Sequence, residues 1–209
     1  FFVADEPQVP TWNDLPPQDP ELINAMSKAF MDSGGEIKEV LRVMFNSDSF
    51  KNARSKKVKS PIELVAGVLK LAGEYTDYRP GLAGYVQTTT LNMGQWLLNP
   101  PTVEGWHTGK EWIDGGNLTE RVNVAVEQIG DGLSPGIKQI IDQLVEGDSL
   151  SSPESFVADT LDALGPIDVE ESTREALIQF ASKTEGEEAR SRVVRMLRLM
   201  VSTPDFQYA

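Results

Sequence analysis

The chain has 209 residues, 40% of them hydrophobic, so it can bury a sizeable core and is not expected to be disordered. Its 32 acidic and 19 basic side chains give a net charge of -13, which disfavours a nucleic-acid partner unless the cations gather on one face. The absence of cysteine excludes thiolate catalysis, disulfides and cysteine-ligated metal, and apolar runs of only a few residues, such as Trp96 to Leu98, predict no membrane span.

The chain begins with "FFVADEP", which has neither a methionine nor the residue order of a signal peptide. We therefore expect a further portion of the protein before it, with Phe1 to Val3 ending an element that starts there. Residues 4 to 18 contain four prolines and Trp12 and are predicted to form an extended arm.

From residue 19 onward, apolar residues recur at spacings of three and four, without a sustained alternation, which predicts helices and no strands. The apolar stripes span residues 22–30, 37–45, 64–71, 82–97, 122–129, 137–144, 156–164, 177–180 and 193–201. The predicted fold is all-α: an irregular multi-helix bundle of about nine helices with a long loop rich in Trp, Gly and Pro.

Helix ends are marked by capping residues. A small polar residue before a proline can accept a hydrogen bond from an amide of the first helical turn. The proline that follows has no N–H, and a helix needs none at that position. Such pairs are Asp19-Pro20, Ser60-Pro61, Ser134-Pro135, Ser152-Pro153 and Thr203-Pro204, while Ser60 with Glu63 and Asn117 with Glu120 have capping-box spacing. Predicted helix ends are Gly34, Gly73, Gly130, Gly147, Gly165 and Gly186.

Basic residues are concentrated in "KNARSKKVK", residues 51 to 59, which holds five of the 19. This cluster is either a contact for a polyanion or a solvated connector. We favour the connector because no aromatic residue is interleaved with the charges, and we expect no nucleic-acid partner.

Two domains are predicted: residues 1–130, with the arm and the long loop, and a smaller C-terminal helical unit, residues 131–209, packed on the first. The boundary is placed where glycine and serine bracket the stretch from Gly130 to Ser152, and a single domain is the alternative. "VLRVMFNSDSF" (40–50) and "MLRLMVSTPDF" (196–206) resemble each other. We interpret them as one packing device used twice: a helix, a polar break and a turn that returns Phe50 or Phe206 to the core.

The long loop, "NPPTVEGWHTGKEWIDGGN" (99 to 117), contains two of the four tryptophans and the only histidine. Asn99-Pro100-Pro101 should end the preceding helix. Loops of this length are usually functional or pinned by their own side chains. Loop 99–117 is therefore either a strap, with its tryptophans packed on the bundle, or a ligand or interface site. The candidate residues are Asn99, Glu104, Trp106, His107, Lys110 and Trp112.

Catalytic chemistry in this loop is not expected. Glu104 and His107 have E-x-x-H spacing, but the chain has no second histidine and the local prolines and glycines oppose a helix, so we expect no metal. Glu104, Glu111 and Asp114 beside tryptophans resemble a sugar-hydrolysis site, yet carboxylates are expected anywhere in so acidic a chain. His107 has no identifiable orienting partner or nucleophile. We assign no catalytic residue and no cofactor.

Three blocks have a family resemblance. "KSPIELVAGVLKLAG" (59–73), "MGQWLLNPPTVEGWHTGKEWIDGGNLTERVNVA" (93–125) and "MLRLMVSTPDFQYA" (196–209) resemble the C-terminal half of the bacterial domain-of-unknown-function family 1800 (DUF1800). "FFVADEP" resembles the point where the N-terminal half of that family joins the C-terminal half. The resemblance covers nearly the whole chain in order.

The resemblance implies a type of protein and a cellular location, but no specific activity. Members are large, mostly helical and typically exported proteins, often encoded beside a sulfatase-like family, and their activity is not established. Their histidine-rich block lies in the N-terminal half and does not map onto this chain. Many members have proline at the position of His107, which argues against a general catalytic role for it, whereas Pro100, Gly105 and Trp106 fit the family. The expected location is the periplasm or cell envelope.

The favoured hypothesis is a non-catalytic structural or interaction module, the C-terminal part of a larger exported bacterial protein. Its expected partners are the N-terminal half of the same protein and a sulfatase-like protein. The alternative is part of an enzyme or binding protein acting on envelope polysaccharide or sulfated glycan, with the site completed by the N-terminal half. That alternative predicts a concave surface bearing Glu104, Trp106, His107 and Lys110.

Overall fold

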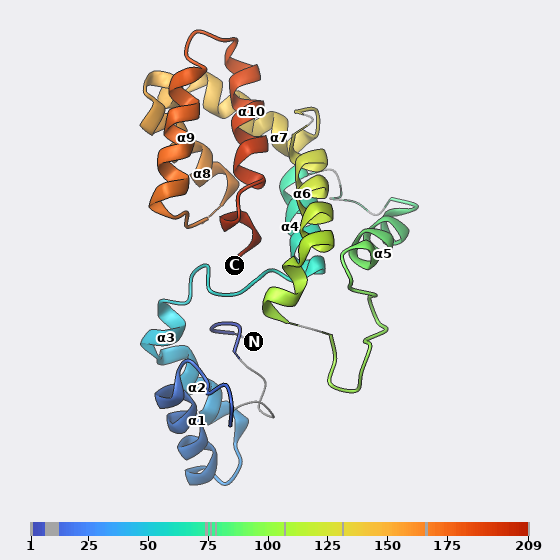
Figure 1. Ribbon diagram of the computed structural model, residues 1–209, viewed down its shortest axis with the longest axis vertical. Coiled ribbons are helices and arrows are strands. Elements are labelled where there is room, and N and C mark those ends of the chain that lie inside the picture. The colour runs from blue at the N-terminus through green and yellow to red at the C-terminus, as the bar shows by residue number, and fades with distance from the viewer. Residues whose placement is uncertain are drawn as a thin grey trace. The chain divides into compact units, whose positions relative to one another are not determined.

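A computed structural model describes residues 2–6, 13–73, 75, 77, 79–106, 108–130, 132–165 and 167–208 (Figure 1). The helices are α1 (Pro20–Asp32), α2 (Ile37–Asn46), α3 (Asp48–Lys51), α4 (Pro61–Ala72), α5 (Leu82–Asn92), α6 (Gly115–Ile129), α7 (Pro135–Glu146), α8 (Pro153–Leu164), α9 (Glu171–Lys183) and α10 (Ala189–Val201). Short 3-10 turns occupy η2 (Gly109–Ile113), η3 (Asp148–Ser151) and η4 (Asp205–Gln207). Over these described ranges the all-α prediction is confirmed.

Each predicted stripe corresponds to one helix, and the four-residue α3 is an addition. The predicted stripe of α5 ran on to Leu97, but the helix stops at Asn92. It stops there because the chain turns at Gly94, whose φ of 88° lies in the left-handed region that glycine adopts readily.

The chain divides into two compact units, residues 1–57 (unit 1) and residues 58–209 (unit 2). The predicted boundary near residue 130 lies inside unit 2, where α6 and α10, on its two sides, share one hydrophobic core. The structure therefore divides after residue 57, and the predicted smaller helical unit, residues 131–209, lies within unit 2.

Unit 1 is a helical pair, α1 with α2, followed by α3. Asp19 caps α1 by accepting a 2.9 Å hydrogen bond from the Leu22 amide, and the Ser49 hydroxyl of α3 donates to the same carboxylate. Phe45 makes edge contacts with Phe2 and Phe50, with ring centroids 5.5 and 4.9 Å apart. Among the described residues of this unit only Met44 is buried, so the pair exposes much apolar surface.

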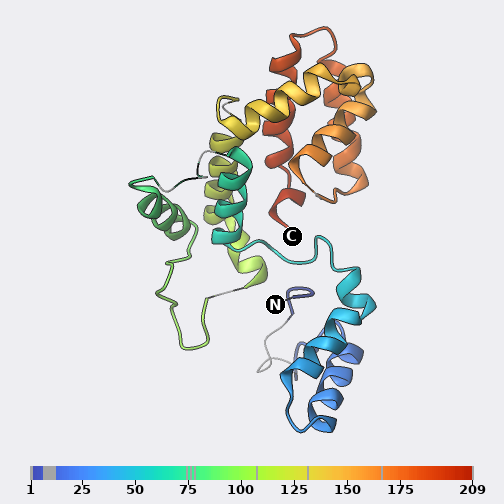
Figure 2. The ribbon, with the colours of Figure 1, turned by 180° about the vertical axis from the view of Figure 1, so that it is seen from behind.

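Unit 2 is built on α4 packed against α6, with α7 to α10 completing the bundle (Figures 1 and 2). Ser60 and Glu63 form the predicted capping box at the start of α4, and Gly73 ends that helix at a φ of 71°. The core takes one face from each helix. Its largest side chains exposed by less than 2% include Leu64, Ile129, Ile141, Phe156, Leu177 and Leu197.

The C-terminal segment, residues 205 to 208, returns to the start of unit 2. Tyr208 pairs with Val58 in an isolated antiparallel bridge, and Asp205 accepts hydrogen bonds from the Glu170 amide (3.0 Å) and the Thr173 hydroxyl (2.8 Å). Phe206, only 6% exposed, enters the core, as the predicted packing device requires. Thr203-Pro204 thus precedes the short turn η4 and not a full helix.

No described helix combines the length and the apolar character needed to traverse a lipid bilayer.

Candidate functional site

Loop 99–117 leaves the bundle after α5 and returns through η2 to α6 (Figure 1). Its deepest anchor is Trp112 in η2, which is only 4% exposed. A Cβ placed on Gly94 would lie 3.9 Å from Cζ3 of the Trp112 ring and 3.5 Å from Nδ2 of Asn117. The Trp112 ring therefore lies against the turn after α5, and Asn117 in the first turn of α6 approaches the same glycine.

The outer part of the loop is held by hydrogen bonds. The Trp106 Nε1–H donates to the Trp96 carbonyl over 3.1 Å, and Trp106 itself is half-buried. Thr102 and Gly105 close a tight turn through a 3.2 Å backbone bond, with Gly105 at a φ of 107°. These contacts link the outgoing and returning arms of the loop.

The polar candidates do not converge on one buried point. Asn99, Glu104 and Lys110 are exposed, and the Glu104 amide donates to the Thr102 hydroxyl at 3.2 Å. His107 lies outside the described residues, so its predicted role stays a prediction. Within the described ranges, no group of three His, Cys, Asp or Glu side chains could hold a metal ion.

Gln95 is an anchor that the sequence analysis missed. It is 5% exposed, and its Oε1 accepts a 2.8 Å hydrogen bond from the Ile62 amide, one of the free amides in the first turn of α4. No spacing rule singles out this glutamine, because its partner lies 33 residues earlier in the chain. Gln95 fixes the start of the loop to α4.

Unit 1 has an apolar groove of about 700 Å³ between the N-terminal segment and helices α1 and α2. Most of its lining is hydrophobic and includes three methionines, and several lining side chains are partly open to solvent. The apolar lining is Phe2, Val3, Ala4, Leu22, Ile23, Met26, Phe30, Met31, Ile37, Val40, Leu41 and Met44. Among them, Phe30 is 41% and Met31 75% exposed. We call this surface the unit 1 groove.

The charged residues that line the unit 1 groove are Glu6 and Asp19. Glu6 accepts a 2.7 Å hydrogen bond from the Gln18 amide. The pKa of Asp19 lies below its usual value, mainly because the Ser49 hydroxyl donates to it and secondarily because the Leu22 amide does. Both carboxylates sit near the start of α1, so the charged residues that line this end of the groove are acidic.

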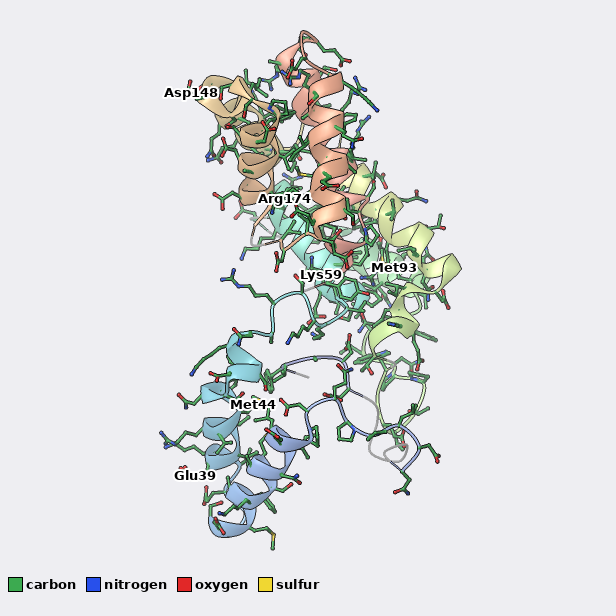
Figure 3. All side chains as sticks on the ribbon, turned by 60° about the vertical axis from the view of Figure 1, so that its left-hand side comes forward. Glu39, Met44, Lys59, Met93, Asp148 and Arg174 are labelled. Carbon is green, nitrogen blue, oxygen red and sulfur yellow. The ribbon has the colours of Figure 1, made fainter. Side chains whose placement is uncertain are left out.

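A cationic cluster lies in unit 2 beneath the C-terminal segment. The Lys59 ammonium, labelled in Figure 3, donates to the Phe206 carbonyl at 2.8 Å and stands 4.5 Å from the centre of the Phe206 ring. Arg121 of α6 donates from Nε to Oε1 of Gln207 at 2.8 Å and from Nη2 to the Lys59 carbonyl at 2.7 Å. The cluster holds the C-terminal segment against the start of α4. The predicted solvated connector is therefore wrong at Lys59, which is half-buried.

Burial lowers the pKa of both cations. The pKa of Lys59 falls to about 8, chiefly by desolvation and then by the positive charge of Arg121, while Glu63 acts in the opposite direction. Desolvation lowers the pKa of Arg121 to about 10, again opposed by Glu63.

Unfolding free energy should therefore rise with pH above about 8. Between the native pKa of Lys59 and its ordinary value of 10.5, the unfolded chain binds more protons than the native chain, so stability increases with pH. Below pH 8 both states hold the proton, and the full cost of burying the charge remains. Denaturant titrations of wild type and Lys59→Met from pH 7 to pH 9.5 should show a smaller upward slope in the variant. Equal slopes would contradict this assignment.

Comparison with known proteins identifies one family. A family model described as "Protein of unknown function (DUF1800)" matches residues 1–208, which include both units and loop 99–117. No curated protein and no solved structure matches the chain.

Proposed function

We propose, from the premise that the chain belongs to the DUF1800 family of proteins of unknown function, that it is a non-catalytic interaction module. The observation that supports this proposal is the unit 1 groove. A helical pair that buries only Met44 among its described residues leaves a large apolar area in contact with water, and such areas mark binding surfaces.

The shape and chemistry of the groove fit an amphipathic helix. Helix-in-groove recognition uses apolar side chains of the partner at positions i, i+3, i+4 and i+7. Met26, Met31 and Met44 supply flexible, polarisable side chains that can adapt to such a stripe. Glu6 and Asp19 favour a partner helix that places a lysine or arginine at the start of α1.

The proposed source of that helix is the N-terminal half of the same polypeptide. This follows from the proposal that the chain is the C-terminal part of a larger exported bacterial protein, supported by the resemblance of "FFVADEP" to the family's internal junction. A sulfatase-like protein is the second proposed partner. Loop 99–117 is in this view a strap, supported by the burial of Trp112.

Peptide binding tests the proposal. Fluorescently labelled amphipathic helices from the N-terminal half, each with one basic end, should bind residues 1–209 in anisotropy titrations. Met26→Glu should weaken binding about tenfold or more, because the new carboxylate would be desolvated beneath the peptide. Ala25→Glu adds the same charge at an exposed position of α1 outside the groove and should leave binding unchanged.

The outcome that counts against the proposal is equal binding by Met26→Glu and Ala25→Glu, or no binding by any such helix. A parallel calorimetric titration with neutral and sulfated oligosaccharides addresses the glycan alternative. Saturable sugar binding that is lost in Trp106→Ala would favour that alternative over the interaction module.

A further inference from the structure

We infer that Met26 and Met31 of α1 form an oxidation site that controls how tightly the unit 1 groove binds apolar partners. The inference rests on the proposed function, because it concerns regulation of the same surface. Both residues line the groove; Met31 is 75% exposed and Met26 is partly exposed. An oxidant dissolved in water can therefore reach both sulfur atoms when no partner covers the groove.

The accessible methionines of the chain are confined to this groove. Of the six methionines, all of which lie in the described ranges, four are exposed by 5% or less: Met44, Met93, Met196 and Met200. Met44, labelled in Figure 3, also lines the groove, and the other three lie in the core of unit 2. Because the chain has no cysteine, methionine sulfur is its most readily oxidised group. Limited oxidation should therefore modify Met31 first and Met26 second, and spare the four buried side chains.

The oxidant in this inference is a hydroperoxide, of which hydrogen peroxide is the simplest. A lone pair of the thioether sulfur attacks one peroxide oxygen, so that an S–O bond forms and the O–O bond breaks. The departing hydroxide takes the proton from the transferred oxygen, and the products are methionine sulfoxide and water. Sulfur loses two electrons and the peroxide gains them. Methionine sulfoxide reductases reverse the change: the oxygen leaves as water while two thiols become a disulfide.

Oxidation would change the surface that a partner has to cover. The thioethers of Met26 and Met31 are apolar and polarisable, so they suit an apolar partner. A sulfoxide oxygen is a hydrogen-bond acceptor, and covering it with an apolar side chain is unfavourable unless a donor is near. The acidic lining residues, Glu6 and Asp19, offer acceptors and no donor when ionised, so they cannot satisfy the new oxygen. An oxidised groove should therefore hold a partner helix less tightly.

The experiment compares the same protein before and after limited treatment with hydrogen peroxide. Peptide mapping by mass spectrometry locates the sulfoxides in the full chain, and anisotropy titrations with the labelled amphipathic helices give Kd. In wild type, sulfoxide at Met31 and Met26 should raise Kd about tenfold or more, with no change in circular dichroism at 222 nm. Treatment with the two methionine sulfoxide reductases, one for each epimer, should restore the original Kd.

Two variants separate the groove methionines from oxidation in general. The double variant Met26→Leu/Met31→Leu keeps apolar side chains of similar volume, and its Kd after peroxide divided by its Kd before should be close to one. Adding Ala25→Met to the double variant supplies an oxidisable thioether at an exposed position of α1 outside the groove. Peroxide should oxidise this position readily, and the ratio of the two Kd values should again be close to one.

Four results would overturn the inference and leave the proposed function standing. The first is an equal Kd before and after oxidation of wild type, and the second is oxidation of the buried methionines ahead of Met31. The third is an equal rise in Kd in the variant with Ala25→Met, which would make the effect independent of the groove. The fourth is a loss of the helical signal together with binding, which would mean damage to the fold.

A different result would contradict the proposed function itself, namely that no helix binds the unoxidised chain. The neutral apolar dye Nile red then replaces the peptide as the probe of the groove. A dye affinity that falls on oxidation of wild type, but not of Met26→Leu/Met31→Leu, would support control of the groove by its methionines. An unchanged dye affinity in wild type would overturn the inference as well.

Discussion

Replacing Trp112 with alanine is expected to lower the free energy of unfolding of unit 2 by about 3 kcal/mol. The indole is 4% exposed and lies against Gly94, so its removal opens a cavity beside the turn after α5. Lost burial and the unfilled space both contribute to the cost. Urea titrations followed by circular dichroism at 222 nm measure the change without relying on tryptophan fluorescence.

Trp96→Ala is the matched control. This side chain is 50% exposed, and the carbonyl that accepts from Trp106 belongs to its backbone and remains after substitution. A loss within about 1 kcal/mol is expected. If Trp112→Ala is as mild as Trp96→Ala, loop 99–117 is not anchored by its buried ring and the strap hypothesis fails.

The helices could be predicted from the sequence because their signals are local. Spacings of three and four placed a stripe on every helix longer than four residues, and Asp19, Ser60 and Ser152 cap helices at the predicted positions. Such features depend on residues within one or two turns. Within the loop, the residue types predicted that tryptophan would anchor it. They did not show that Trp112 would be buried and Trp106 only half-buried.

A competing local signal misplaced the start of α6. The spacing of Asn117 and Glu120 predicts a cap at Asn117, but α6 begins at Gly115, and Asp114 accepts a 3.2 Å hydrogen bond from the Asn117 amide. Both Asp114 and Asn117 are good capping residues, and two glycines between them weakened the prediction of helix there. The burial of Trp112 just before Asp114 is consistent with the earlier start.

Long-range contacts explain what the sequence analysis missed. Lys59 was assigned to a solvated connector, whereas its ammonium bonds the carbonyl of Phe206, 147 residues later. The continuity of unit 2 across residue 130 is equally non-local, because it depends on α6 sharing a core with α10. Neither follows from spacing or composition, since both depend on which helices pack together.

Gly136→Ala is expected to destabilise unit 2 by about 3 kcal/mol or more, although alanine is the better helix former. Gly136 lies in the first turn of α7, where the helix meets the end of α4. A Cβ at this position would stand 2.1 Å from the Leu71 carbonyl oxygen and 3.0 Å from the Ala72 carbonyl oxygen. These are backbone atoms, so the clash is relieved only if α4 and α7 move apart, and that movement would loosen the core around Ile137 and Val68.

Gly67→Ala tests whether the effect comes from the contact or from the residue type. Gly67 lies within α4, and a Cβ there would meet no atom within 4 Å. Alanine should raise stability at this exposed position by about 0.5 to 1 kcal/mol, because glycine loses more backbone freedom on folding. Glycine-to-alanine substitution should therefore change the free energy of unfolding in opposite directions at the two sites. Urea titrations under one set of conditions measure both changes. If Gly136→Ala also stabilises the chain, the close backbone approach of α4 and α7 is wrong, and the packing of the two helices would have to be wider than described.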